Sequence, residues 1–141
     1  MTYREKLAWL SLLGLLVTFG PYFVITAQNP PAPNDLPNLG QMLKFGIAAG
    51  GYALLTGAAY LLARLGAGNG RMPVDERDLA IERRSMQAAY YVLMFGMLYV
   101  GCFWPFTERG WTIVNGTALV VVIAEAVRCL MAGFAYRRSA A

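Results

Sequence analysis

LAWLSLLGLLVTFGPYFVITA, residues 7–27, is the first of four long apolar runs that decide the fold of this chain. The other three lie at about residues 39–65, 85–106 and 111–134. Each run reaches the roughly 20 residues that a helix needs to cross about 30 Å of hydrocarbon. The sequence therefore predicts four transmembrane helices.

The composition also favours a membrane protein. Hydrophobic residues make up 57% of the 141 residues and charged residues 14%, against about 45–50% and about 25% in typical soluble domains. Four such helices inside a soluble protein of this size would leave almost no polar surface. We therefore expect one integral membrane domain over residues 1–141, an all-α four-helix transmembrane bundle whose third helix extends into the cytoplasm.

Lysine and arginine residues are distributed unequally between the two sides of the predicted bundle. Ten of the 12 fall near the termini or the loop at residues 66–84, and two, Lys44 and Arg109, fall on the other side. Cytoplasmic segments carry such an excess, so we expect cytoplasmic termini and a cytoplasmic loop in a bacterial inner membrane. The net charge of +4 then reflects topology and attraction to membrane lipids rather than direct nucleic-acid binding.

The loop ends in the one stretch dense in charge, MPVDERDLAIERRS at residues 72–85. On a helix continuous with the third span, Asp75, Asp78 and Glu82 share one side, with Arg77 and Arg84 roughly opposite. A helix that lies flat on a membrane needs one apolar face, which this segment lacks. Because topology alone would require only arginines, we expect the acidic residues to make contacts.

Three interpretations of this segment remain open. It can be a solvated extension that anchors the topology, or a docking site for a cytoplasmic regulatory protein. It can also form ion pairs, either with the same helix of a second subunit or with Arg64, Arg71, Arg137 or Arg138 of its own bundle. The predicted partner-binding residues are Asp75, Glu76, Arg77, Asp78, Glu82, Arg83 and Arg84.

Residues 72–100 also resemble a known family. Its pattern is xDERDxxIxxRSxxxAYYVL, matched here by Val74 to Asp78, Ile81, Arg84-Ser85 and Ala89 to Leu93. The pattern is similar to that of small four-span inner-membrane proteins grouped as the DUF2178-type family. That family has no established activity, so the resemblance implies no reaction. Its members are often encoded beside a small helix-turn-helix regulator, which implies a regulatory role.

The second apolar run carries a stripe of small residues at steps of four, three and four: Gly46, Gly50, Ala53 and Gly57. Residues at these steps share one helix face, where another helix backbone can approach closely. The stripe predicts a helix-packing face, which serves either a homodimer or packing within one subunit. Arg64 continues the same face.

Glu125 is the one acidic residue well inside a predicted span. An ionised carboxylate in the membrane is costly, so we expect it to be protonated, paired or hydrated. Arg128, three residues later, can reach back to it, and Arg64 is an alternative partner. The pair either holds helices together or forms the site of a small transporter or a lipid- or apolar-ligand-binding protein.

The sequence contains no recognisable set of catalytic residues. It lacks histidine, the commonest metal ligand and proton shuttle, and it has no glycine-rich phosphate loop after a strand. We therefore predict no catalytic residue, metal or cofactor. The leading expectation is a non-enzymatic regulatory or adaptor protein in signalling, which contacts its partner through residues 75–84.

Overall fold

The computed structural model describes residues 3–30, 38–66, 75–108 and 110–139, and its described elements are all helices. The predicted all-α four-helix bundle is confirmed. Four helices are long and apolar enough to cross a membrane, so the fold is that of a multi-pass integral membrane protein. In chain order the elements are α1 (Tyr3–Gln28), α2 (Leu39–Gly66), α3 (Glu76–Cys102), the short α4 (Trp104–Thr107) and α5 (Trp111–Ser139).

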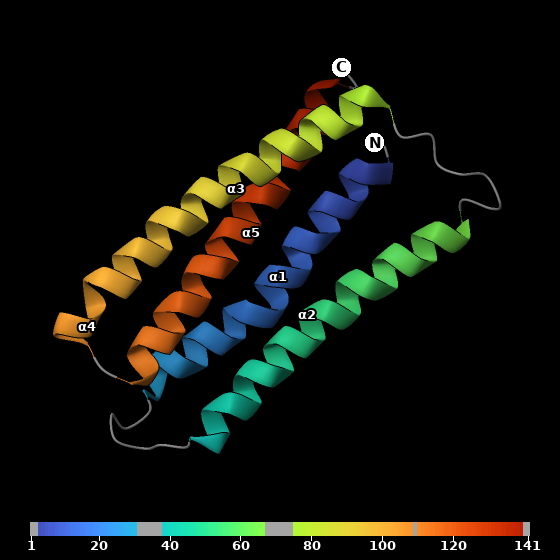
Figure 1. Cartoon of the computed structure of the whole chain (residues 1–141). Helices are drawn as coiled ribbons and strands as arrows, with labels where there is room; N and C mark the ends of the chain where they lie inside the picture. The colour runs from blue at the N-terminus through green and yellow to red at the C-terminus, as the bar shows by residue number, and fades with distance from the viewer. Residues whose placement is uncertain (1–2, 31–37, 67–74, 109, 140–141) are drawn as a thin grey trace.

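The four long helices lie side by side in the order α3, α5, α1, α2 (Figure 1). The central helix α5 contacts α3 on one flank and α1 on the other, and α2 contacts α1. The start of α1, the start of α3 and the end of α5 lie at one end of the molecule (Figure 1). We call this the basic end, because it carries Arg4, Arg77 and Arg137, and the opposite end the loop end.

The third helix extends beyond the start of its predicted span, as the sequence analysis predicted, but ends before the predicted end. It begins at Glu76, so residues 76–84 are helical and continuous with the span, whereas residues 67–74 lie outside the described residues. It ends at Cys102, short of residue 106, and α4 follows after Phe103. The physical reason is Pro105, which has no backbone N–H to donate and whose ring clashes with the carbonyl four residues earlier.

The apolar core lies between α1, α2 and α5. Leu15, Phe19, Tyr22 and Ala48 are buried there. The Phe19 ring meets Tyr22 and Phe45 edge to face, with centroids 6.3 Å away in both cases. In the other half of the molecule, Trp9 of α1 packs edge to face on Phe134 of α5 at 5.5 Å.

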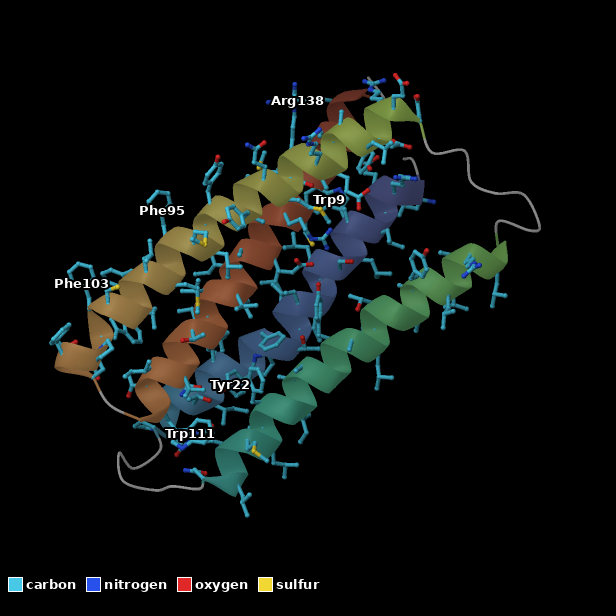
Figure 2. The ribbon with its side chains drawn as sticks, in the orientation of Figure 1. Trp9, Tyr22, Phe95, Phe103, Trp111 and Arg138 are labelled. Carbon is cyan, nitrogen blue, oxygen red and sulfur yellow. The ribbon has the colours of Figure 1, made fainter. Side chains whose placement is uncertain are left out.

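Many large apolar side chains point away from this core. Phe95 of α3 and Phe103, which directly follows α3, project outward (Figure 2), and 72% and 65% of their surfaces are exposed. Leu54 and Leu62 are similarly exposed on α2. An outer surface this apolar matches the hydrocarbon of a bilayer and would be unfavourable in water.

The small-residue stripe of α2 faces the outside of the molecule. All four of its residues are exposed. A Cβ added at Gly46, Gly50 or Gly57 would meet no atom of the described residues within 4 Å. The alternative in which this stripe packs within one subunit is therefore wrong, because α2 turns the face with Ala48 and Tyr52 toward its neighbours. The homodimer alternative stays a prediction.

Close helix contacts occur at other glycines instead. A Cβ at Gly96 of α3 would overlap the side chain of Val120 on α5, and one at Gly133 of α5 would lie 3.0 Å from the Trp9 ring. These glycines let large side chains of the neighbouring helix fit against the backbone. The α3–α5 and α1–α5 interfaces thus depend on Gly96 and Gly133.

Candidate functional site

Glu125 and Arg128 of α5 form a two-pronged ion pair within the apolar part of the helix. Nε of Arg128 donates to Oε2 of Glu125 at 2.9 Å, and Nη2 donates to Oε1 at 2.5 Å. Helical spacing of three residues places the two side chains on the same side of the helix. The structure thus brings together the two residues that the sequence analysis singled out inside the membrane.

Tyr52 of α2 joins this pair from another helix. Its hydroxyl donates to Oε1 of Glu125 at 3.1 Å, and the thiol of Cys129 lies 3.9 Å from the same oxygen. The Tyr52 bond links α2 to α5, which are separated along most of their length by α1 (Figure 1). We call Tyr52, Glu125 and Arg128 the polar cluster.

The polar cluster is only partly shielded. The side chains of Arg128 and Glu125 remain 32% and 28% exposed. In a bilayer, such a surface must meet lipid headgroups, water or a ligand, because hydrocarbon cannot satisfy polar groups. The cluster can therefore offer hydrogen bonds to something outside the chain.

An apolar groove lies next to the polar cluster. It has a volume of about 330 Å³ and runs between α5, Phe19 of α1 and Phe45 of α2. Its α5 wall consists of Ile113, Val114, Thr117, Ala118, Val121 and Val122. Val122 precedes Glu125 by three residues, so the groove ends one helical turn before the ion pair.

A second tyrosine forms a hydrogen bond near the other end of the groove. The hydroxyl of Tyr22 on α1 donates to Oδ1 of Asn115 on α5 at 2.5 Å. Figure 2 shows Tyr22 at the loop end, beside the start of α5. The Tyr22–Asn115 and Tyr52–Glu125 bonds thus tie α5 to α1 and to α2 near the two ends of the groove.

The charged segment 75–84 is joined to the rest of the bundle at Asp78. Its Oδ2 lies 3.4 Å from Nε of Arg4 on α1. The Arg4 side chain also interacts with Tyr136 of α5. Three helices therefore meet through Arg4 at the basic end. Ser85, 1% exposed, donates to the carbonyl of Glu82 at 2.8 Å just below this contact.

The remaining predicted contact residues point outward. Asp75 is the N-cap of α3, and its side chain makes no capping hydrogen bond. Of the seven predicted partner-binding residues, only Asp78 is half-buried. The exposed ones are Asp75, Glu76, Arg77, Glu82, Arg83 and Arg84.

Within the described residues, the predicted arginine partners form no ion pair with the acidic residues of the charged segment. Arg64, Arg137 and Arg138 are exposed, and Figure 2 shows Arg138 pointing away from the bundle. Arg71 lies outside the described residues. Within the described part of the chain, Arg128 and not Arg64 is the ion-pair partner of Glu125.

Sequence reasoning missed two residues of these sites, Tyr52 and Arg4. A tyrosine in the middle of an apolar span is a signal for Tyr52, since a hydroxyl at that depth needs an acceptor. Arg4 could have been found from topology, because an even number of spans returns the third helix to the side of the N-terminus. Neither signal predicts which faces of the helices meet.

No group of three or more His, Cys, Asp and Glu side chains suited to a metal ion is found within residues 3–30, 38–66, 75–108 and 110–139. No family model, curated protein or solved structure matches this chain. The function must therefore be argued from the two sites themselves.

Proposed function

We propose that this chain is a non-enzymatic regulatory or adaptor protein of a bacterial inner membrane, with both termini in the cytoplasm. Its contact surface for a cytoplasmic partner protein is the charged face, which we define as Asp75, Glu76, Arg77, Glu82, Arg83 and Arg84. The excess of lysine and arginine at the basic end supports this orientation. The resemblance of residues 72–100 to the DUF2178-type family supports a regulatory role.

The observation that carries the proposal is the exposure of the charged face. Six charged residues of both signs lie at the start of α3 and remain exposed. Arg4 of the neighbouring helix α1 contacts Asp78 and none of these six residues. The Arg4–Asp78 contact and the buried Ser85 hold this part of α3 in a defined direction. A rigid helix that displays both charge signs can select a complementary partner surface.

The test is a crosslinking pull-down from native membranes with a charge-reversed variant. Asp75→Lys, Glu76→Lys and Glu82→Lys are combined, and Asp78 is retained so that its contact with Arg4 survives. The control is Glu108→Lys, which reverses an exposed charge at the loop end. We expect a soluble partner to be captured by the wild type and the control but lost from the triple variant, with capture falling at high salt.

Two results would contradict the adaptor function. One is capture of the same soluble proteins by the wild type and the triple variant. The other is recovery of the chain alone from both, which would make the charged face a solvated topology anchor.

A second candidate function is favoured by the groove beside the polar cluster. An apolar groove with a few convergent polar groups is the usual form of a small-ligand site. This candidate is a small transporter or a carrier of an apolar or lipid ligand that uses Glu125 and Arg128. Proton-coupled transport would be lost in Glu125→Gln, whereas the adaptor function would tolerate that substitution.

A further inference from the structure

A pocket with a volume of about 510 Å³ lies at the loop end, where the chain passes from α3 through α4 toward α5 (Figure 1). We call it the aromatic pocket. Its rings come from Tyr99, Phe103, Trp104 and Phe106, and Glu108 adds a carboxylate. Of the described residues that line this pocket, none is basic. Neither the polar cluster nor the charged face contributes to it.

Local contacts hold this part of the chain against α5. Pro105 lies in the first turn of α4, a position that tolerates the missing N–H. The ring of Trp104 lies against the backbone of Gly116 on α5, where an added Cβ would overlap it. The backbone N–H of Glu108 donates to the carbonyl oxygen of Trp104 at 2.6 Å. The acidic residue is thus tied to an aromatic residue that packs directly on α5.

The rings are close enough together for one cation to meet more than one of them. The ring centroids of Tyr99 and Trp104 are 6.5 Å apart and their planes meet at 72°. The ring of Phe103 lies 5.6 Å from that of Tyr99. An ammonium group is attracted to the face of an aromatic ring within about 6 Å of its centroid. A single ammonium group in the pocket is therefore within range of two rings.

The charge of the pocket favours a cation over an anion. The face of an aromatic ring is negative, and the exposed Glu108 forms no ion pair with a residue that the structure describes. An anion would be repelled by both, and a neutral apolar group would gain nothing from the carboxylate. The N-terminal dipole of α5 acts in the opposite sense, so the preference has to be measured with ligands of all three charge types.

The aromatic pocket lies at the depth of the lipid headgroups. Helix α5 has 29 residues and is therefore about 43 Å long, against roughly 30 Å of hydrocarbon. Its first turn, and Glu108 before it, then extend beyond the hydrocarbon. Tyrosine and tryptophan are common at this depth as interfacial anchors. Anchoring alone does not require several rings to line one pocket together with a carboxylate.

We propose that the aromatic pocket binds an alkylated ammonium group, such as the trimethylammonium group of choline. The rings contact the methyl groups of the cation, and Glu108 provides the opposite charge. The ammonium group belongs either to a soluble compound or to the headgroup of a lipid. Because the pocket lies at the opposite end of the bundle from the charged face, this site is independent of the adaptor function, for which Glu108→Lys remains a control.

The test compares three probes of the same shape and different charge. The full chain is titrated in a maltoside detergent, which has no ammonium group. The probes are choline, its neutral carbon isostere tert-butylethanol, and the anion of tert-butylacetic acid. Binding is measured by saturation-transfer NMR of the probe methyl groups. We expect choline to bind about tenfold more tightly than the alcohol, a difference of about 1.4 kcal/mol, and the anion to bind most weakly.

Substitutions at Phe106 test the contribution of the rings. Phe106 is 89% exposed, so Phe106→Leu removes a ring without disturbing the core. It should weaken choline binding about twofold to fivefold, the effect of one exposed ring. Phe106→Trp should bind choline at least as tightly as the wild type, because tryptophan is the best ring for a cation. Phe95→Leu, at an exposed residue outside the pocket, is the matched control and should behave as the wild type.

Substitutions at two neighbouring charges test the sign of the ligand. Glu108→Gln should weaken choline binding about twofold and remove most of its dependence on salt. Arg109, the next residue in the sequence, lies outside the described residues. Because Arg109→Gln removes a positive charge, it should leave choline binding unchanged or strengthen it. Weaker choline binding in Arg109→Gln would contradict a cation site.

Lipid competitors distinguish the two sources of the ammonium group. Phosphatidylcholine and phosphatidylglycerol with the same acyl chains are added to separate samples that contain choline. Displacement of choline by phosphatidylcholine alone assigns the site to a lipid headgroup, and displacement by neither lipid assigns it to a soluble cation. Both results support the ammonium site. Equal displacement by the two lipids overturns it, because an acyl chain would then be the occupant.

Three further results overturn the proposal. They are binding of choline no tighter than that of its neutral isostere, tighter binding of the anion, and equal choline binding by Phe106→Leu and Phe95→Leu. None of them bears on the charged face, because the adaptor function is tested separately by the pull-down with the triple variant.

Discussion

At the scale of single residues, the polar cluster couples membrane insertion to helix packing. A carboxylate and a guanidinium inside an apolar span are each costly alone, and the bonds between Glu125 and Arg128 satisfy most of their polar atoms. The Tyr52 hydroxyl then uses the carboxylate as an acceptor on a neighbouring helix. The pair thus provides a side-chain hydrogen bond by which α2 reaches α5.

The contribution of this bond can be measured with Tyr52→Phe. Removal of the hydroxyl should lower the free energy of unfolding in detergent or bicelles by about 0.6 kcal/mol, and by at most about 1.7 kcal/mol, the range found for hydrogen bonds between membrane helices. Tyr60→Phe is the matched control, because Tyr60 lies on the same helix and is 58% exposed. Equal stability losses in the two variants would show that Tyr52 contributes nothing beyond its ring.

At the scale of the helices, α5 is the element on which the others are assembled. It contacts α3 through Val120, which lies against Gly96, and α1 through Gly133, which lies against Trp9. The outer helices present long apolar faces outward and have few buried residues of their own. Their attachment therefore depends on a small number of close contacts.

The contact at Gly96 provides the prediction at this scale. Gly96→Ala should destabilise the protein by about 1–3 kcal/mol, since the added Cβ overlaps Val120 and α3 must move away from α5. Gly101→Ala on the same helix meets no described atom within 4 Å and should be neutral or slightly stabilising. Denaturation of both variants in mixed micelles measures the difference. If Gly96→Ala is as stable as Gly101→Ala, the close α3–α5 contact is not present in the membrane.

At the scale of the whole molecule, the four helices form a layer whose edge helix α2 presents the small-residue stripe outward. Exposed Leu54 and Leu62 are ordinary lipid-facing side chains. A line of glycines, in contrast, presents little side-chain surface to the bilayer and allows another helix to approach closely. This arrangement is what a symmetric contact between two copies through α2 would require.

Disulfide crosslinking in native membranes tests such a homodimer. With Cys102 and Cys129 replaced, we expect Gly50→Cys to form a crosslinked dimer on oxidation, because the two stripes would place these positions face to face. Ala58→Cys lies on an exposed face of α2 away from the stripe and should remain monomeric. Equal crosslinking at both positions, or none at Gly50→Cys, argues against a dimer through this face.

The two predicted sites differ in how far sequence patterns alone could describe them. Arg128 reaches Glu125 three residues away on the same helix, so helical periodicity was sufficient to predict their pairing. The partner of Asp78 is Arg4, which is 74 positions away in the chain, and charge counting could limit the candidates only to one side of the membrane. Tyr52 was missed for the same reason, because its acceptor lies on another helix.

Membrane spans, their number and the local ion pair were determined by the sequence itself. The free energy of placing a segment in hydrocarbon depends on the length of that segment and on the residues it contains. It can therefore be judged without knowing the rest of the chain. Which faces meet was decided only by the tertiary structure: Gly46, Gly50 and Gly57 face outward while Gly96 and Gly133 lie against large side chains. Helix pairing depends on how the shapes of all four helices fit together, because the lipid is as apolar as the side chains and favours no particular pairing.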